Sequence, residues 1–256
     1  MSRLTILGLG PARPEQMTLE AREALAQAVA SGARAYGLAH ARALVEAVEP
    51  RLVIHELDYL YRLPGVDRPV AYRDLATMLV RRAFEDQVEV LYLVAGSPLF
   101  INDAVLQIRR LCQQRQLPLR LIHGMSFVEL VLQGVYWTGH RGLQLLSAWN
   151  VARDGMELQT DRPALLCQLG EFSVGGEALA TDGSVGVLVE LRDRLASSYP
   201  LDHPVAVLAS SGHPDYLPQT RQIPLSALAD EPVPVYSNLW VPAIGGPAVE
   251  SEVASG

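Results

Sequence analysis

The sequence predicts an α/β protein made of two α/β domains with a cofactor cleft between them. Short apolar runs rich in β-branched residues alternate with amphipathic helical runs along the first half of the chain, an order typical of a largely parallel sheet. Glycine turns directly follow three of the apolar runs. Of the 256 residues, 49% are hydrophobic, which is enough for one large core or two modest ones.

The elements of the first half follow from these patterns. The first helix is expected over residues 18–30, because Thr18 can cap it and Glu20 lies where the helix dipole favours an acid. Further helices are expected over residues 39–48, 72–85 and 104–114, and strands over residues 5–7, 52–55, 90–94 and 119–122.

The second half offers a different set of runs. Strands are expected over residues 143–146, 164–169, 205–209 and 239–241, with a helix over residues 185–197. The domains are therefore expected at residues 1–122 and 123–242. Residues 243–256 are small and polar, which predicts a disordered tail.

The glycine turns predict a ligand site. Gly8 and Gly10 lie in the first turn, and Gly96 and Gly124 follow the strands at 90–94 and 119–122. In open α/β sheets, ligands bind outside the carboxyl ends of the strands, so three such turns indicate one shared cleft. The first turn lacks the G-x-G-x-x-G and G-K-[ST] patterns of nucleotide loops, and taken alone it favours a tight structural turn.

An ordered set of motifs resembles the tetrapyrrole methylase superfamily, the two-domain S-adenosylmethionine-dependent methyltransferases. The motifs are L-G-L-G-P, A-G-S-P-L-F, G-M-S-F, L-L-C-Q-L-G, Y-P-L-D-H-P-V-A-V-L and S-N-L-W-V-P, and they span residues 2–242. Two branches are most similar: the borosin peptide backbone N-methyltransferases and the methylase domains found beside nucleotide pyrophosphohydrolases. The resemblance implies S-adenosylmethionine, or S-adenosylhomocysteine as product, and a homodimer.

The resemblance also implies which residues bind the cofactor. Those residues are Gly10, Pro11, Gly96, Ser97, Leu99, Phe100, Ser126, Phe127, Gln168, Leu169, Ala209 and Ser210. Ser97 departs from the G-D-P or G-H-P of the family, since a hydroxyl has neither the charge of aspartate nor the ring of histidine. Phe100 and Phe127 are also compatible with plain core positions, and Ser126 with a helix cap completed by Glu129.

A tyrosine-rich segment is the candidate catalytic region. Pro69 suits the first turn of a helix, which puts Arg68 at its start and Tyr72 one turn later, with Tyr61 arriving from the preceding loop. Methylating a backbone amide requires removal of the N–H proton and stabilisation of the imidate oxyanion, which a tyrosine and an arginine can provide. The segment is similar to the borosin catalytic segment, although the tyrosine that borosins carry before G-H-P is Ala95 here. The alternative is a solvated ion pair of Arg68 with a neighbouring aspartate and a packed Tyr72.

Composition narrows the function classes. The net charge is −7 and all 21 basic residues are arginines without a basic tract, so no nucleic-acid partner is expected. Neither a long apolar span nor an amino-terminal signal is evident, which predicts a cytoplasmic protein without a membrane partner. Cys112 and Cys167 stand far apart and the histidines lack ligand spacing, so no metal or disulfide is expected.

Three functions remain open at this point. The first is methylation of backbone amides on a separate precursor peptide, which Arg68 and Tyr72 favour. The second is methylation of a tetrapyrrole or another small molecule. The third is a cofactor-binding regulatory protein without catalysis, which Ser97 and Ala95 favour.

Overall fold

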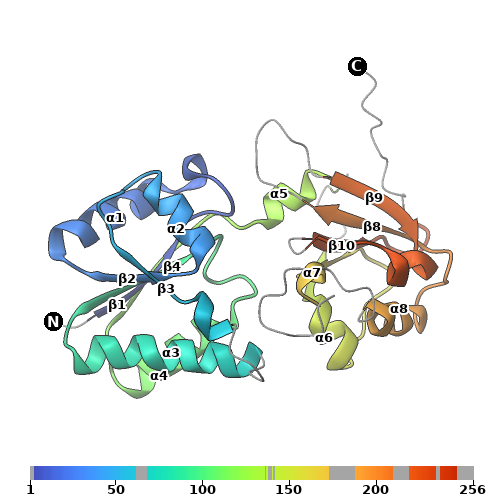
Figure 1. Cartoon of the computed structure of the whole chain (residues 1–256). Helices are drawn as coiled ribbons and strands as arrows, with labels where there is room; N and C mark the ends of the chain where they lie inside the picture. The colour runs from blue at the N-terminus through green and yellow to red at the C-terminus, as the bar shows by residue number, and fades with distance from the viewer. Residues whose placement is uncertain are drawn as a thin grey trace. The chain divides into compact units, whose positions relative to one another are not determined.

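The computed structural model describes residues 3–61, 68–135, 137, 140, 142–172, 188–209, 219–234 and 237–246. The chain forms two compact units, Met1–Phe127 and Val128–Gly256, each with its own five-stranded sheet (Figure 1). The division falls after Phe127 rather than after residue 122. Residues 123–127 stay with the first unit because the turn at Gly124 lies against two other turns of that unit.

The first unit is a parallel α/β sheet, as the alternation of runs predicts. The sheet order is β3-β2-β4-β1-β5, with every pairing parallel. Its elements are β1 (Arg3–Gly8), η1 (Pro14–Gln16), α1 (Leu19–Ser31), β2 (Arg34–Gly37), α2 (Ala39–Glu46), β3 (Ile54–Glu56), η2 (Asp58–Tyr61), α3 (Arg68–Glu85), β4 (Glu89–Val94), α4 (Asp103–Gln114) and β5 (Leu119–Ile122).

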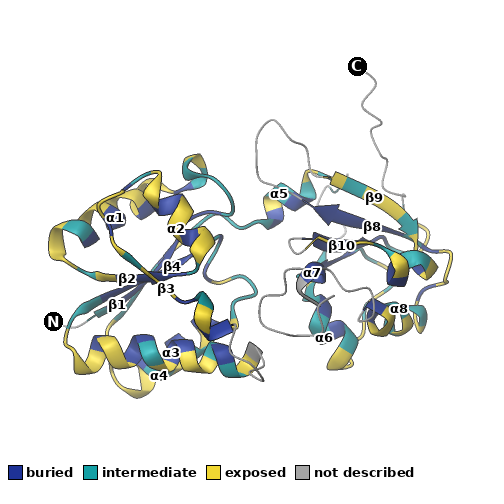
Figure 2. Cartoon of the chain, viewed as in Figure 1, coloured by how far each residue is buried: buried dark blue, intermediate teal, exposed yellow. Residues whose placement is uncertain are grey.

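Helices cover both faces of this sheet. α1 and α2 lie on one face and α3 and α4 on the other, and the central strands are buried (Figure 2). On the first face, Leu25 and Val45 pack with Leu7 and Leu93. A sheet buried on both faces leaves only its strand ends for a ligand.

The start of α1 follows the prediction closely. The Thr18 hydroxyl accepts a hydrogen bond from the Ala21 amide at 3.1 Å, so Thr18 caps the helix. The helix ends at Gly32, which has φ +67°. α3 starts at Arg68, as Pro69 in the first turn predicts, and so begins four residues before the helical run expected from residue 72.

The second unit has a mixed sheet of order β6-β7-β10-β8-β9. Only β6 and β7 pair in parallel, and the other pairs are antiparallel. Its elements are α5 (Val128–Leu132), β6 (Gln144–Ser147), α6 (Ala148–Arg153), β7 (Ala164–Cys167), α7 (Leu169–Phe172), α8 (Leu188–Ala196), β8 (Pro204–Ala209), β9 (Gln219–Pro224), η4 (Leu225–Asp230) and β10 (Ser237–Val241). Residues of α6, α8 and η4 form one core with β7, β8 and β10.

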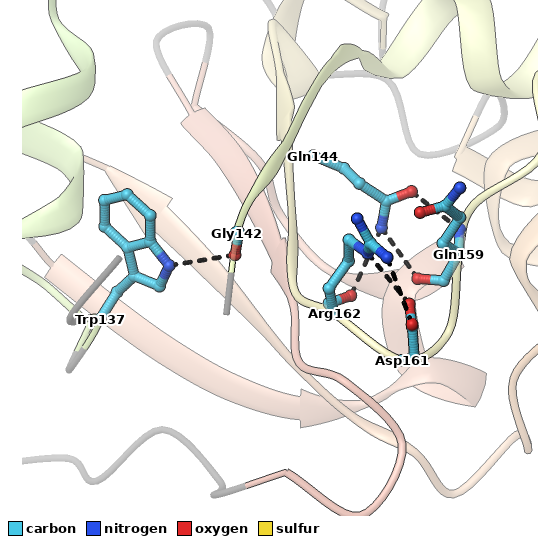
Figure 3. Close-up of polar contacts among 6 residues, drawn as sticks. All are labelled: Trp137, Gly142, Gln144, Gln159, Asp161 and Arg162. Carbon is cyan, nitrogen blue, oxygen red and sulfur yellow. Dashed lines mark hydrogen bonds and ion pairs between the residues drawn. The ribbon is translucent and has the colours of Figure 1, made fainter. Parts of the chain in front are cut away.

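Hydrogen bonds of the Gln144 side chain hold the segment that leads into β7 (Figure 3). The Gln144 side chain donates to the carbonyl of Gln159 at 2.9 Å and accepts from the Gln159 amide at 2.7 Å. It also donates to the carbonyl of Arg162, whose guanidinium pairs with Asp161. One side chain therefore makes three hydrogen bonds to the loop that precedes β7.

Two strands and part of the tail differ from the sequence prediction. β2 and β9 were not predicted, because β2 (Arg-Ala-Tyr-Gly) contains no β-branched residue and β9 is an edge strand of mostly polar residues. Within the predicted disordered tail, the Ile244 amide donates to the Thr160 carbonyl at 2.9 Å, so residues 243–246 are held in a turn rather than disordered. Residues 247–256 lie outside the described residues.

Candidate functional site: a glycine-lined strand edge and a tyrosine cluster

The carboxyl ends of β1, β4 and β5 lie side by side, since β1 pairs with both other strands. The chain after β1 contacts the chain after β4: the Gly96 amide donates to the Gly10 carbonyl at 2.7 Å, and the Leu9 amide donates to the Val94 carbonyl at 2.8 Å. The three glycine turns that the sequence singles out therefore meet at one edge of the first sheet.

These turns approach one another closely through their backbones, and the Pro98 ring also lies against Gly8. A Cβ on Gly124 would lie 2.4 Å from the Gly96 oxygen and 2.7 Å from the Gly8 carbonyl carbon, and a Cβ on Gly8 would lie 2.5 Å from the Gly124 nitrogen. Such distances leave no room for any side chain at either position. Gly8 and Gly124 are thus required for the three turns to approach one another.

Gly96 has a different role in the same turns. Its φ is +79°, and among the described residues a Cβ added there would meet only the Met125 oxygen, at 4.0 Å. The space in front of Gly96 is therefore open, and its backbone is free of side chains on that side. A ligand that needs close approach to the main chain fits this position.

The loop after β1 is held by Gln16. Its side-chain oxygen accepts from the amides of Ala12 and Arg13, at 3.1 and 3.0 Å. Pro11 lies in this loop and is half-buried. Gly10, with φ +81°, fits against the Gln16 backbone, where a Cβ would lie 2.5 Å from the Gln16 oxygen.

The loop after β4 presents apolar side chains. The Ser97 hydroxyl accepts from the Leu99 amide at 3.4 Å, and Leu99 is 51% exposed. The Phe100 and Phe127 rings meet edge to face at 5.5 Å. Ser97 thus holds a local turn, and the paired rings provide an apolar wall of the kind that a nucleoside or thioether needs.

Ser126 lies between the Gly124 turn and α5 and is half-buried. α5 begins at Val128, two residues beyond Ser126. Gly10, Pro11, Gly96, Ser97, Leu99, Phe100, Ser126 and Phe127 thus all belong to the three turns of the first unit.

The second unit carries the remaining predicted cofactor residues. Gln168 follows β7 and has φ +64°, an unfavourable conformation for a residue with a side chain and one that clusters at functional sites. Leu169 is fully buried in the core, so only its backbone can meet a ligand. Ala209 ends β8, and Ser210 lies outside the described residues. A cleft shared by the two units stays a prediction.

Ser237 lies at the start of β10, beside the end of β8, and was not among the predicted site residues. It pairs with Ala209 across β10 and β8, and its buried hydroxyl has no hydrogen-bond partner among the described residues. In the sequence, its one distinguishing feature is that it begins the S-N-L-W-V-P motif. An unpaired buried hydroxyl at the end of a strand is suited to bind a ligand.

The predicted catalytic tyrosines lie together. The rings of Tyr61, at the end of η2, and Tyr72, in α3, pack edge to face with centroids 5.9 Å apart. Tyr61 is buried and Tyr72 is half-buried. Arg68 is the first residue of α3, and its side chain lies outside the described residues.

A third tyrosine joins this pair without having been predicted. Tyr92 of β4 is 4% exposed, and its pKa is raised by burial first and by the charge of Tyr72 second. Burial therefore favours the neutral phenol of Tyr92. In the sheet Tyr92 is level with Tyr36, whose ring lies 5.1 Å from that of His55. In sequence, Tyr92 is indistinguishable from an ordinary strand residue.

Other candidate chemistry is limited. Among the described residues, no group of three His, Cys, Asp or Glu side chains could hold a metal ion, and no helix is long and apolar enough to cross a membrane. Cys112 and Cys167 are free and buried, and burial raises their thiol pKa values to about 11 and about 12. Neither is a reactive thiol at neutral pH.

Comparisons with known proteins agree with this geometry. The family model described as "Tetrapyrrole (Corrin/Porphyrin) Methylases" matches residues 3–217. No curated protein matches the chain.

Solved structures of low sequence identity share the fold. The chain is similar to uroporphyrin-III-C-methyltransferase from Thermus thermophilus, with a TM-score of 0.63, 16% identity and coverage of 95% of this chain and 96% of the other. It is similar to the methyltransferase CobJ at 0.62, with 15% identity and 98% of both chains covered. For a diphthine synthase the TM-score is 0.59, with 18% identity and coverage of 94% and 90%.

Proposed function

Because the chain belongs to the tetrapyrrole (corrin/porphyrin) methylase family, we propose that it is an S-adenosylmethionine-dependent methyltransferase whose acceptor is a backbone amide of a separate peptide. One observation carries the choice of acceptor: the edge-to-face pair of Tyr61 and Tyr72 at the start of α3. The similarity to borosins in particular is part of this proposal.

The proposal that S-adenosylmethionine is the cofactor rests on the glycine turns at the carboxyl ends of β1, β4 and β5, which we call the glycine edge. S-adenosylmethionine presents a carboxylate, an ammonium, a sulfonium and an adenine, so it needs backbone donors and acceptors beside an apolar wall. The open space at Gly96 and the paired rings of Phe100 and Phe127 offer both. When bound, the cofactor would supply an electrophilic methyl group.

The acceptor half rests on the tyrosines. An amide nitrogen becomes nucleophilic only after it loses its proton, and Tyr72 is the half-buried phenol that a substrate can reach. Tyr61 packs against its ring and limits its rotation. Arg68 is the first residue of an 18-residue helix, and the positive end of the helix dipole together with an arginine at this position would stabilise the imidate oxygen.

A second candidate acceptor is a tetrapyrrole or another small molecule. Its support is the family itself and the likeness to uroporphyrin-III-C-methyltransferase and CobJ. A carbon acceptor would need no amide deprotonation, so this reaction would depend far less on Tyr72.

The test uses the purified protein with S-adenosylmethionine and candidate peptides encoded beside its gene. Intact-mass analysis should show gains of whole methyl groups on the peptide, located on backbone amides by fragmentation. Tyr72→Phe should reduce transfer by about 10²–10⁴-fold, the usual range for losing an acid or base. Tyr59→Phe is the matched control, because Tyr59 is 55% exposed in the same segment.

Arg68→Lys should also reduce transfer, since an ammonium does not reproduce the planar donors of a guanidinium. Cofactor affinity should stay at the parental value in all three variants. Parental rates in Tyr72→Phe and Arg68→Lys would contradict the amide reaction and favour the small-molecule acceptor. Cofactor binding with no transfer to either class of acceptor would favour a regulatory protein.

We also propose that the protein is a homodimer, as the family resemblance implies. Light scattering should then give a mass near twice 27.9 kDa. A monomeric mass at every concentration would contradict it.

A further inference from the structure

A cavity of about 200 Å³ opens at the amino end of the first sheet, between the sheet and α1. It lies at the opposite end of β1 from the glycine turns, since Arg3 and Thr5 line it and Gly8 ends the strand. It is therefore separate from the methyltransferase site described above.

Small side chains on α1 create the space. Ala24 and Ala28 face the cavity from successive turns of the helix, where larger residues would fill the gap against Thr5 and Leu91. The sheet register puts Thr5 level with Arg120, so both side chains reach the same cavity from neighbouring strands.

Two polar atoms of the cavity have no partner among the described residues. Thr5 is 3% exposed and its hydroxyl is fully buried, and the Arg3 Nε is also buried and unpaired. Buried polar groups are nearly always hydrogen-bonded, so an unpaired hydroxyl in the wall of a cavity points to a bound partner.

The charged groups in the wall determine whether the cavity suits an anion or a cation. Arg3 and Arg120 contribute two positive charges to the wall and Glu89 one negative charge. The Glu89 carboxylate already accepts from Arg3 and from the Ser31 hydroxyl, whereas Arg120 uses one nitrogen on Glu20. A guanidinium has five N–H groups, so the unused capacity is mainly for donation.

We propose that this cavity binds a small organic carboxylate. Its carboxylate accepts from the Thr5 hydroxyl, the Arg3 Nε–H and Arg120, and its short apolar part lies against Ala24 and Ala28. A ligand there ties α1 to two strands, β1 and β5, at the end of the sheet remote from methyl transfer, so it is suited to regulate the stability of the first unit.

The test is a titration of the full-length protein with sodium propionate at constant ionic strength, followed by backbone-amide NMR. Saturable shifts should be confined to residues around Thr5, Ala28 and Arg120. Thr5→Val should weaken propionate binding about tenfold or more, the usual loss for one hydrogen bond to a charged group. Arg120→Gln should weaken it similarly.

Arg110→Gln is the matched control, because it removes the same charge from an exposed position on α4 outside the cavity. Without propionate, Thr5→Val should melt at or above the parental temperature, since no protein partner of the hydroxyl is lost. S-adenosylhomocysteine affinity should stay parental in Thr5→Val, which separates this proposal from the methyltransferase site.

Three outcomes would overturn the proposal. They are the absence of saturable shifts, an equal loss in Arg110→Gln and Arg120→Gln, and a Thr5→Val variant that melts lower but binds propionate as the parent does. The last outcome would identify the hydroxyl as a structural, water-bonded group.

Discussion

The carboxyl ends of the strands in the first sheet (the carboxyl edge) and their amino ends (the amino edge) carry different chemical groups. At the carboxyl edge, Gly8, Gly96 and Gly124 allow three backbones to come into contact. At the amino edge, Arg3 pairs with Glu89, and Arg34 pairs with Asp86 at 2.7 Å. One sheet therefore offers main-chain groups to a ligand at one end of its strands and fixed charges at the other.

The largest effect should come from closing the carboxyl edge. Gly124→Ala puts a Cβ 2.4 Å from the Gly96 oxygen, so the turns must separate. The free energy of unfolding should fall by about 3 kcal/mol, within the range for overpacking, and cofactor binding should be lost. Urea unfolding measures the first and calorimetry the second.

The control for that variant is Gly32→Ala. Gly32 has φ +67° with nothing within 4 Å of an added Cβ, so only conformational strain of about 1–2 kcal/mol is expected and binding should persist. A Gly124→Ala variant as stable as the parent would show that the close approach of the turns is not required.

A second prediction tests whether each of the two units stays closed. Cys112 lies in α4 of the first unit and Cys167 in β7 of the second, and neither should react with Ellman's reagent at pH 8 until the protein unfolds. Rapid labelling of Cys112 alone would show that the first unit opens independently.

The same thiols give a pH dependence. Their folded-state pKa values, about 11 and about 12, lie above the unfolded value of 9.0, so their contribution to stability is complete below pH 9. It should decline as pH rises from about 9 to 11, by up to about 1.4 kcal/mol per pH unit for each thiol, because the unfolded state ionises first. Cys112→Ala and Cys167→Ala should each flatten this decline, and equal slopes in parent and variants would contradict the assignment.

The smallest effect is expected at the amino edge. Arg34→Gln removes one of two arginine partners of Asp86, since Arg82 also pairs with it at 3.3 Å, and the side chains are partly exposed, so the unfolding free energy should fall by about 0.5 kcal/mol and less in high salt. Cofactor affinity should not change. A loss comparable to that of Gly124→Ala would mean that the ion pairs, rather than the glycines, organise the sheet.

The two edges also differ in how far the sequence predicts them. Each glycine of the carboxyl edge follows its own strand directly, and Thr18 stands where a helix cap belongs, so local patterns suffice. Arg3, Thr5 and Arg120 have no common motif, and only strand register brings them together.

The site residues that the sequence did not predict have the same explanation. Tyr92 resembles any apolar strand residue until α3 places Tyr72 near it, and Ser237 becomes notable only when its hydroxyl is found buried without a partner. Tyr61 and Tyr72 were predicted as a pair because Pro69 marks the helix start that brings them together.

Isothermal titration of S-adenosylhomocysteine into three proteins tests the central claim that the glycine edge is the cofactor site. The parent and Gly32→Leu should bind with the same affinity, whereas Gly96→Leu should give no binding heat. Gly96 and Gly32 have similar positive φ angles, and among the described residues nothing lies closer than 4.0 Å to a Cβ added at either position, so both variants are expected to carry similar backbone strain and only one to block the ligand. Parental affinity in Gly96→Leu, or a parent that binds neither S-adenosylhomocysteine nor S-adenosylmethionine, would contradict the account.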